Sequence, residues 1–418
     1  MKRARLVVAA LVLAACSEAT PPAAPPAPPK PAYVSAWFSG PDTVLNIHQT
    51  AGGHGGVIRE AGGDFVPVRA IHMDATSLSF FVPKLNAGFR GAKAEDRSWT
   101  GEWTARGKTT ERALVPADAP EMSETFVTLD DGRWTQYRCA GTGSPVILLD
   151  YGAGASMASW KDVFDPLSQV TQTCMFERAA SGLSDPGRLP RDVNHAVADM
   201  VAFLGAAKID GPVVLVGYSL ASYHIRQFAN LHPEQTAGLV LVDPSGDGQD
   251  GRFAAVIPNM RELMPDSVDE ATVTACSQGL RAIVSSIPFW PTPDDLDPII
   301  GKCGGNDPDR AEAVLSEIAA MEVVSTGQIR AAQRPYGDLP LIVLTRGDYK
   351  KGMPPGFTDD ATAALAKIWI AMHAEMAAQS SIGQTRTIPG AGHRIQSDAP
   401  QAVIDAVKEV VAAARSKS

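Results

Sequence analysis

A serine in a turn of small residues is the strongest chemical feature of the sequence. Ser219 stands in the pattern Gly217-Tyr-Ser219-Leu-Ala221, directly after the apolar, mostly β-branched run 213–216. A helix-forming run follows at once, so the serine would occupy a sharp turn between a buried strand and a helix. In the similar pattern Gly-x-Ser-x-Gly, such a turn presents the serine hydroxyl as a nucleophile. The alternative is an ordinary strand-to-helix turn with a serine that caps the helix.

A serine hydroxyl is a weak nucleophile near neutral pH and needs an adjacent base to take its proton. Among the eight histidines, His393 alone lies in a loop of small residues, Gly390-Ala-Gly392-His393, just past a late predicted strand. We expect His393 to be the base; the alternative is a solvated loop histidine. His224 lies five residues past Ser219 on the following helix, where it would face away from the serine, and we expect it to be structural.

The elements around Ser219 alternate between strands and helices from about residue 123 to residue 418. This alternation is typical of an α/β protein with a mostly parallel sheet that is covered by helices on both faces. An Asp-Gly turn within residues 126–139 predicts a hairpin that precedes this sheet. The remaining predicted strands are 145–150, 173–177, 213–217, 238–243, 339–345 and 384–388, and the main predicted helices are 192–207, 358–378 and a closing helix near residues 403–411.

This part of the chain resembles the α/β-hydrolase-fold enzymes, on motifs that occur in the family's order. A glycine loop, 150–154, comes first, and the segment 177–185 (Glu-Arg-Ala-Ala-Ser-Gly-Leu-Ser-Asp) is similar to Asp-Arg-x-Gly-x-Gly-x-Ser. The Ser219 turn and the loop that ends at His393 complete the set. The chain departs from the family at Asp150-Tyr151, where many members have His-Gly, and at Ala180, Ala221 and Ser222, which replace glycines.

The resemblance implies an acid that holds the tautomer of the His393 imidazole. Asp243 ends the strand after the Ser219 turn, a position used by one group of lipases. Asp348 follows the next strand, where most members keep the acid, but it comes two positions before the usual Gly-x-x-Asp register, which falls on Lys350. We favour Asp243 and keep Asp348 as the alternative.

The family also implies an oxyanion hole made of two backbone N–H groups. These would belong to Leu220, at the start of the helix, and to Ala153 in the glycine loop. The glycines at 152 and 154 would let this backbone approach the substrate closely.

A long insertion, about residues 248–336, separates the strands that end at Asp243 and begin at Leu339, and it predicts a helical cap. Its many apolar residues favour an apolar or acyl ester as the small-molecule substrate. The alternative is that these residues only pack the cap itself.

The N-terminus has the pattern of an export address. Residues 1–16 carry a basic start, a short apolar run and Leu13-Ala-Ala-Cys16, which resembles a bacterial lipobox with Cys16 as the lipidation site. Buried acyl chains contribute ~0.8 kcal/mol per CH₂, so this anchor would hold the protein at a membrane. The alternative is an ordinary cleaved signal peptide. Ser17 after the cysteine indicates the periplasmic side of the outer membrane or the cell surface.

Two segments precede the predicted hydrolase domain. The Pro/Ala-rich residues 17–32 predict an extended linker that spans up to ~50 Å at about 3.1 Å per residue. Residues 33–117 show short alternating runs and glycine pairs, which predict a small all-β domain similar to the N-terminal β module of some secreted hydrolases. We expect the glycine pairs at 52–53, 55–56 and 62–63 to be turns. His48, His54 and His72 fit no metal-ligand spacing, and we expect surface histidines and no metal site.

Four cysteines remain after Cys16, an even number that allows three pairings. The family's sheet order implies a disulfide between Cys139 and Cys174, on neighbouring strands, and a second one between Cys276 and Cys303 within the cap. The alternative is four buried free thiols. The formal net charge is −9 and no basic cluster lies beyond the N-terminus, so nucleic acid is not an expected partner.

These observations predict an exported, membrane-anchored lipoprotein that hydrolyses carboxylic esters through an acyl-enzyme, as a carboxylesterase or lipase does, without a cofactor. A peptidase of the proline-iminopeptidase sort is one alternative, because amides use the same machinery. A non-catalytic envelope protein that uses the fold for binding is the other. An epoxide hydrolase or dehalogenase is disfavoured, because that resemblance would require aspartate at position 219.

Overall fold

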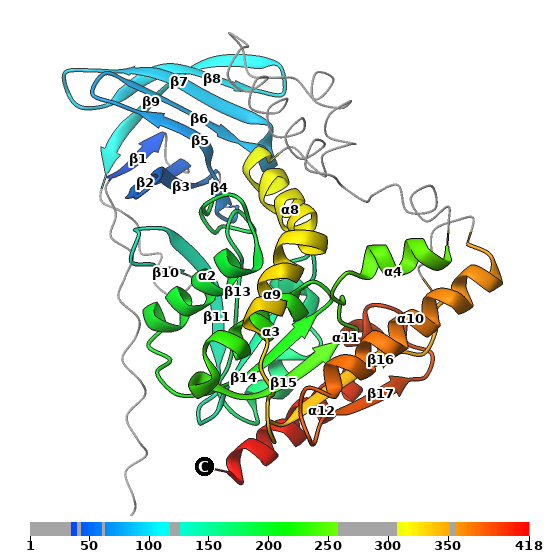
Figure 1. Ribbon diagram of the computed structural model, residues 1–418. Helices are drawn as coiled ribbons and strands as arrows, with labels where there is room; N and C mark the ends of the chain where they lie inside the picture. Colours follow the sequence, from blue (N-terminus) through cyan, green and yellow to red (C-terminus); the bar gives the residue numbers. More distant parts are fainter. Residues whose placement is uncertain are drawn as a thin grey trace, which may run out of the picture.

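The computed structural model describes residues 35–39, 43–60, 63–117, 126–257, 307–351 and 357–417. Cys16, the predicted linker, Cys276, Cys303 and the middle of the predicted cap lie outside these residues. The described residues form two parts, each built on its own sheet (Figure 1). Among them, no helix has the length and apolar character needed to cross a membrane.

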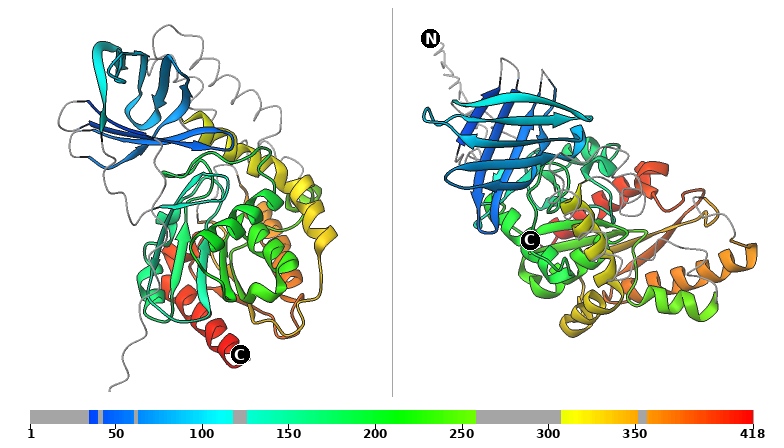
Figure 2. Two further views of the ribbon diagram at one scale, coloured as in Figure 1. Left: turned by 90° about the vertical axis from the view of Figure 1, so that its left-hand side faces the viewer. Right: turned by 90° about the horizontal axis from the view of Figure 1, so that it is seen from above.

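The first part, the β module, spans residues 35–117 and is a nine-stranded antiparallel sheet in which sequence neighbours mostly pair with each other. It curls into two layers, which Figure 2 shows crossing each other. The two edge strands of the sheet are β4 and β5. Val68, which lies between them in the sequence, donates its backbone N–H to the carbonyl oxygen of Gly56 at 2.9 Å. The strands are β1 (Ser35–Ser39), β2 (Thr43–Thr50), β3 (Gly53–Arg59), β4 (Val66–Pro67), β5 (Arg69–Met73), β6 (Ser77–Val82), β7 (Ala87–Lys93), β8 (Trp99–Ala105) and β9 (Lys108–Ala117).

Alternation along these strands turns one face inward, as the sequence pattern predicts. Trp99 and Trp103 lie four positions apart on β8, and both are buried in the core between the layers. The prediction that Gly55 and Gly56 form a turn is wrong, because both lie within β3. A Cβ on Gly56 would lie 2.7 Å from the Asn46 carbonyl oxygen of β2, so this strand needs glycine for close backbone packing.

The second part has an eight-stranded sheet in the order β10-β11-β13-β12-β14-β15-β16-β17. The hairpin β10–β11 and the pair β11–β13 are antiparallel, and the other neighbours are parallel. The strands are β10 (Phe126–Thr128), β11 (Trp134–Ala140), β12 (Val146–Asp150), β13 (Thr173–Phe176), β14 (Val213–Tyr218), β15 (Thr236–Val242), β16 (Leu341–Arg346) and β17 (Gln384–Ile388).

Helices cover both faces of this sheet, as expected for an α/β protein. One face packs against α1 (Phe164–Ser168), α11 (Ile395–Asp398) and α12 (Pro400–Arg415). The other packs against α2 (Val193–Ala206), α3 (Ala221–Leu231) and α10 (Asp359–Ala377). Between β15 and β16, the described residues add α4 (Gln249–Val256), α8 (Pro308–Ala320), the π-helical turn η4 (Met321–Ser325) and α9 (Thr326–Ala332), so the predicted cap contains helices.

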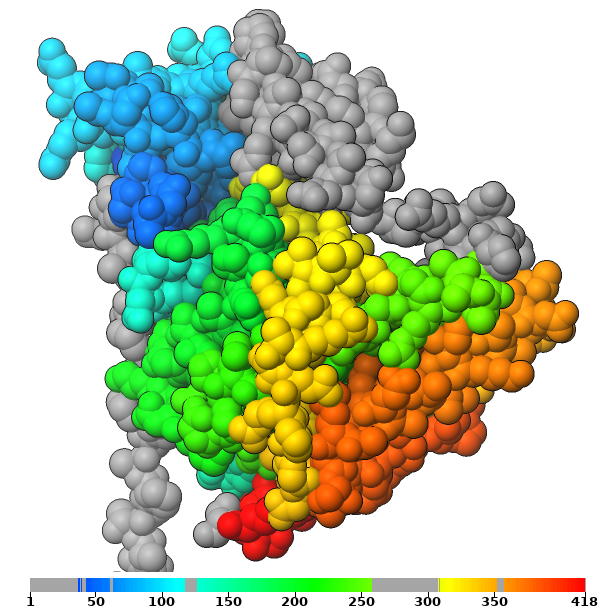
Figure 3. Space-filling view, in the orientation of Figure 1, coloured from blue at the N-terminus to red at the C-terminus, as the bar shows by residue number. Residues whose placement is uncertain are grey.

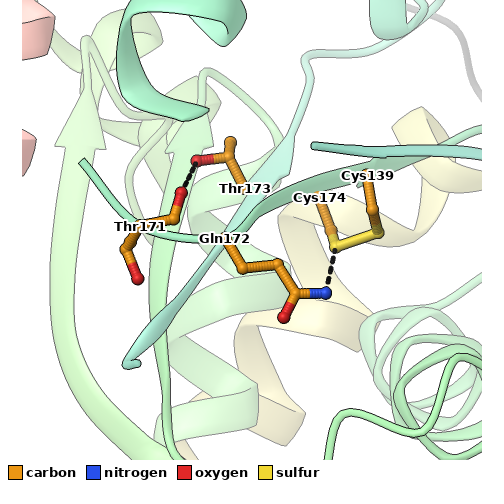
Figure 4. Close-up of a disulfide and its surroundings, with 5 residues drawn as sticks. All are labelled: Cys139, Thr171, Gln172, Thr173 and Cys174. Carbon is orange, nitrogen blue, oxygen red and sulfur yellow. Dashed lines mark hydrogen bonds between the residues drawn. A yellow bond between two sulfur atoms is a disulfide. The ribbon is translucent and has the colours of Figure 1, made fainter. Parts of the chain in front are cut away.

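A disulfide joins Cys139 on β11 to Cys174 on β13, with an S–S distance of 2.02 Å (Figure 4). The two cysteines are direct partners in the antiparallel register of these strands. This is the first of the two expected bridges; both cysteines of the other lie outside the described residues.

The two parts share a buried polar contact. His48 of β2 stacks on the Trp134 ring with centroids 3.8 Å apart, and its Nε2 lies 2.6 Å from Asp185 Oδ2. The same carboxylate oxygen accepts the backbone N–H of Trp134 at 2.7 Å. The prediction of surface histidines is therefore wrong for His48, while His72 is exposed. A Cβ on Gly55 would collide with Asp185, so this glycine allows the close approach of the two parts.

Candidate active site

Ser219 occupies the turn that the sequence predicts, between the last residue of β14 and the first turn of α3. Its φ is +55°, a left-handed conformation that side chains other than glycine rarely adopt. The turn needs small neighbours: a Cβ on Gly217 would lie 2.9 Å from the Ala221 carbonyl oxygen and 2.8 Å from the Ile225 side chain. The strained turn thus holds the serine away from both the strand and the helix.

The structure brings Ser219, His393 and Asp243 together in one hydrogen-bonded chain. His393 Nε2 lies 3.0 Å from Ser219 Oγ, and His393 Nδ1 lies 2.6 Å from Asp243 Oδ2. This geometry fits the tautomer in which Nδ1–H donates to the carboxylate and Nε2 accepts the serine proton. His393 remains 34% exposed, whereas the Asp243 side chain is fully buried.

Asp348, the alternative acid, faces a local turn instead. Its Oδ1 accepts the backbone N–H groups of Lys350 at 2.9 Å and of Lys351 at 3.1 Å. This is the turn-capping role of an aspartate, and it leaves Asp243 as the carboxylate beside His393.

Two further side chains, which the sequence did not indicate, bind Asp243. Arg346, the last residue of β16, donates its Nε to Asp243 Oδ2 at 2.6 Å and its backbone N–H to Oδ1 at 3.0 Å. Trp369 of α10 donates its indole N–H to Oδ1 at 3.0 Å. Burial opposes ionisation of Asp243, but the bond from His393 and the charge of Arg346 outweigh it, and its pKa is lowered.

Arg346 also acts on the base. Its Nη2 lies 2.9 Å from His393 Nδ1, so a permanent positive charge stands beside the imidazole. Burial first, and then this charge, lower the pKa of His393, although the bond to Asp243 acts in the opposite direction. The neutral imidazole, which is the form that can accept a proton, is therefore favoured.

A second histidine near the site is held in its neutral form. His373 of α10 is buried, with Nδ1 2.6 Å from Thr345 Oγ1 and Nε2 3.0 Å from the Pro244 carbonyl oxygen. Because a carbonyl only accepts, Nε2 carries the proton. Burial lowers the pKa of His373 to about 4. We infer that it fixes the backbone next to Asp243.

The predicted oxyanion loop lies directly against the nucleophile. A Cβ on Gly152 would lie 3.1 Å from Ser219 Cβ, so a side chain at this position would crowd the nucleophile. Ala153, the next residue, is exposed, and Leu220 precedes the first residue of α3. The two predicted N–H donors thus belong to segments that meet at Ser219.

A buried arginine supports this loop from behind. Arg178 Nη1 donates to Asp150 Oδ1 at 2.8 Å and to the Tyr151 carbonyl oxygen at 2.6 Å. His224 Nδ1 lies 2.7 Å from Asp150 Oδ2, so His224 faces this carboxylate, as a structural histidine would. The pKa of Asp150 falls to about 2, because the charges of Arg178 and His224 outweigh the effect of burial.

Residues of the segment 177–185 take part in this network. Glu177 Oε2 accepts the Tyr151 hydroxyl at 2.7 Å, and burial raises the pKa of Glu177. Ala180 has φ +62°, the conformation for which the related motif uses glycine. The similarity to Asp-Arg-x-Gly-x-Gly-x-Ser could have indicated that Arg178 supports the neighbouring loop. No group of three or more potential metal ligands occurs among the described residues.

Comparison with known proteins agrees with this architecture. Residues 145–274 match the family profile described as alpha/beta hydrolase fold. A haloalkane dehalogenase described as ancestral superposes with a TM-score of 0.50 and 14% identity, covering 70% of this chain and 99% of that one. The part of the chain that follows the β module has the α/β-hydrolase fold, and we call it the hydrolase part.

Other similarities are weaker. An enol-lactonase from Burkholderia xenovorans LB400 (TM-score 0.46, 15% identity) covers 69% of this chain and 99% of its own. An esterase from Thermogutta terrifontis (TM-score 0.43, 19% identity) covers 69% and 98%. Among curated proteins, "Probable transporter efuK" from Hormonema carpetanum is 34% identical over 105 residues, which are 24% of this chain and 15% of that protein. The chain thus matches only a small part of this relative.

The two aspartates can be separated by kinetics. We expect Asp243→Asn to lower kcat by about 10³- to 10⁴-fold with little change in KM, because the imidazole loses the partner that holds its tautomer. Asp348→Asn, whose amide oxygen can still accept the backbone N–H groups of Lys350 and Lys351, should keep most of the activity and nearly all of the stability. Steady-state kinetics and thermal unfolding of both variants measure this. The reverse pattern would move the acid to Asp348.

The charge of Arg346 should be visible in the pH dependence of kcat/KM. Because this cation disfavours the imidazolium form of His393, the Arg346→Met variant should raise the pKa of His393. The acidic limb of the profile should therefore move to higher pH, whatever the loss in overall rate. Lys350→Met removes an exposed lysine that pairs with Asp359 and should leave the limb in place. An acidic limb at the same pH in Arg346→Met as in the wild type would contradict this electrostatic role.

Proposed function

We propose that this protein is a serine hydrolase that cleaves carboxylic esters through an acyl-enzyme. The observation that carries the proposal is the continuous chain Ser219 Oγ–His393 Nε2 and Nδ1–Asp243 Oδ2, with distances of 3.0 and 2.6 Å. The α/β-hydrolase fold supports hydrolysis in general, and the serine at the turn between β14 and α3 supports acyl transfer in particular. Aspartate would be needed there for the reaction of a dehalogenase.

In the proposed mechanism, His393 takes the proton of the Ser219 hydroxyl as its oxygen attacks the ester carbonyl. The N–H groups of Leu220 and Ala153 bind the oxyanion of the tetrahedral intermediate. The imidazolium returns its proton to the leaving alcohol, and the acyl group stays on Ser219. Water, deprotonated by the same imidazole, then attacks the acyl-enzyme and releases the acid. Asp243 stabilises the imidazolium in both steps.

The substrate proposal is an apolar or acyl ester. It depends on the apolar composition of the chain between β15 and β16, most of which lies outside the described residues. A series of p-nitrophenyl esters with graded acyl length would define the preferred substrate. Hydrolysis of aminoacyl amides with no turnover of any ester would favour the peptidase alternative instead.

The nucleophile is tested by a fluorophosphonate probe, which reacts only with an activated serine. Ser219→Ala should abolish both labelling and ester hydrolysis and leave thermal stability nearly unchanged. Ser222→Ala, three residues further on, removes a buried hydroxyl that donates to the Ser245 carbonyl, and this variant should keep the labelling. Full labelling of Ser219→Ala would overturn the assignment. A wild-type protein that neither labels nor turns over esters would indicate the non-catalytic binding protein.

We also propose that the protein is an exported lipoprotein anchored through Cys16. The support is the Leu-Ala-Ala-Cys sequence after a short apolar run, and the Cys139–Cys174 bridge agrees with an oxidising compartment. Cys16→Ser should move the protein from the membrane fraction to a soluble or uncleaved form. Unchanged fractionation would show that another part of the chain binds the membrane.

A further inference from the structure

Two arginines hold the backbone carbonyl groups of the predicted oxyanion loop. Arg178 donates to the carbonyl oxygens of Tyr151 at 2.6 Å and of Gly152 at 3.2 Å. Arg310 Nη2 donates to the carbonyl oxygen of Gly154 at 3.0 Å. The loop is therefore fixed through three of its carbonyl oxygens, and Asp150 Oδ1 also accepts the Tyr151 N–H at 2.8 Å.

The bond to Gly152 has a direct consequence for the oxyanion hole. The Gly152 carbonyl and the Ala153 N–H belong to the same planar peptide unit, and in a trans peptide they point in opposite directions. Arg178 and the Ala155 N–H, which donates to the same oxygen at 3.3 Å, fix this carbonyl and with it the direction of the Ala153 N–H. An oxyanion donor acts through such preorganised direction, so a rotation of this plane would weaken it.

Both arginines depend on the position of α8. Arg310 lies on its first turn. Arg178 is bound by Glu317, two turns further along α8, through Nε to Oε1 at 3.1 Å and Nη2 to Oε2 at 3.0 Å. This fork-shaped ion pair is buried on both sides, which makes it directional and costly to break. A shift of α8 would therefore be transmitted to the oxyanion loop.

The start of α8 is held by the β module. Asp307 caps the helix by accepting the Arg310 N–H at 3.1 Å, and it pairs with Arg69 of β5, whose Nε lies 3.0 Å from Asp307 Oδ2. Arg69 is fully buried, and its Nη2 also donates to the carbonyl oxygens of Ala180 and Ser184, each at 3.3 Å. Figures 1 and 3 show α8, in yellow, beginning beside the β module and running down over the hydrolase part.

We propose that Arg69 is a positioning residue for the oxyanion hole, and that the β module is in this sense part of the active site. Arg69 contacts Asp307, which fixes α8, and it also contacts the loop that follows Arg178. Through α8 it fixes Glu317, and through the loop it fixes the backbone next to Arg178. Both contacts keep the Arg178 guanidinium at the Gly152 carbonyl. This inference rests on the proposed ester hydrolysis, since an oxyanion must form for the position of the loop to matter.

The test compares an ester with its thionoester, whose sulfur accepts hydrogen bonds poorly. A working oxyanion hole favours the oxygen substrate, so the ratio of the two kcat values reports on the hole itself. The variant is Arg69→Met combined with Asp307→Asn, which removes both charges and keeps a side chain that can cap α8. Loss of one oxyanion donor lowers kcat by about 10²- to 10³-fold. For a displaced donor we expect kcat for the ester to fall about tenfold or more, with little change in KM. The ester-to-thionoester ratio of kcat values should fall as well.

Two further variants keep the inference open to refutation. Arg112→Gln breaks an ion pair with Glu60 inside the β module, at 2.6 Å, and should leave kcat and the ratio unchanged. Glu317→Met removes both acceptor oxygens that link α8 to Arg178 and should reproduce the reduced ratio. A normal ratio in Glu317→Met, or in the Arg69→Met/Asp307→Asn variant, would overturn the proposal even if either variant unfolds at a lower temperature. Failure of the wild type to hydrolyse the ester would instead refute the proposed function.

Discussion

The candidate active site depends on one buried negative charge. The Asp243 side chain is fully removed from solvent, and an isolated carboxylate in such a place would be very costly. Its two oxygens are satisfied by Arg346 at the end of β16, Trp369 on α10 and His393 after β17. A single carboxylate therefore ties three elements of the hydrolase part to the strand that follows the nucleophile, and it orients the imidazole in doing so.

A buried positive charge has the matching role on the other side of Ser219. The guanidinium of Arg178 lies between the carboxylates of Asp150 and Glu317 and reaches the backbone of the oxyanion loop. Removing one partner of such a buried charged group is strongly destabilising, so these contacts reinforce one another. Ser219 thus lies between two buried charges. Asp243 orients the base, His393, and Arg178 holds the oxyanion loop.

Much of the fold and the three residues of the hydrogen-bonded chain could be predicted from the sequence. Ser219 and Asp243 each follow an apolar run, and His393 lies in a loop of small residues after the last strand, so local patterns indicate their places at strand ends. The role of Arg346 could not be found in this way, because its partner Asp243 lies 103 positions away. Likewise, Glu317 lies 139 positions from Arg178. Only the folded chain shows such pairs.

In the β module, one glycine pair led to a wrong prediction of a turn. Gly55 and Gly56 suggest a turn, and yet they lie in β3 because Asn46 and Asp185 leave no room for a side chain. A glycine that serves close packing and a glycine that serves a turn look the same in a sequence. The three-dimensional neighbours decide between them.

The buried contacts between the two sheets also define the size of the cooperative folding unit. His48 and Arg69 of the β module are buried against carboxylates that belong to the hydrolase part and to α8. Separation of the two sheets would expose apolar surface around Trp134 and leave these charges without partners. The boundary near residue 120 is therefore a boundary in the order of the chain, and we expect the two sheets to unfold in one cooperative transition.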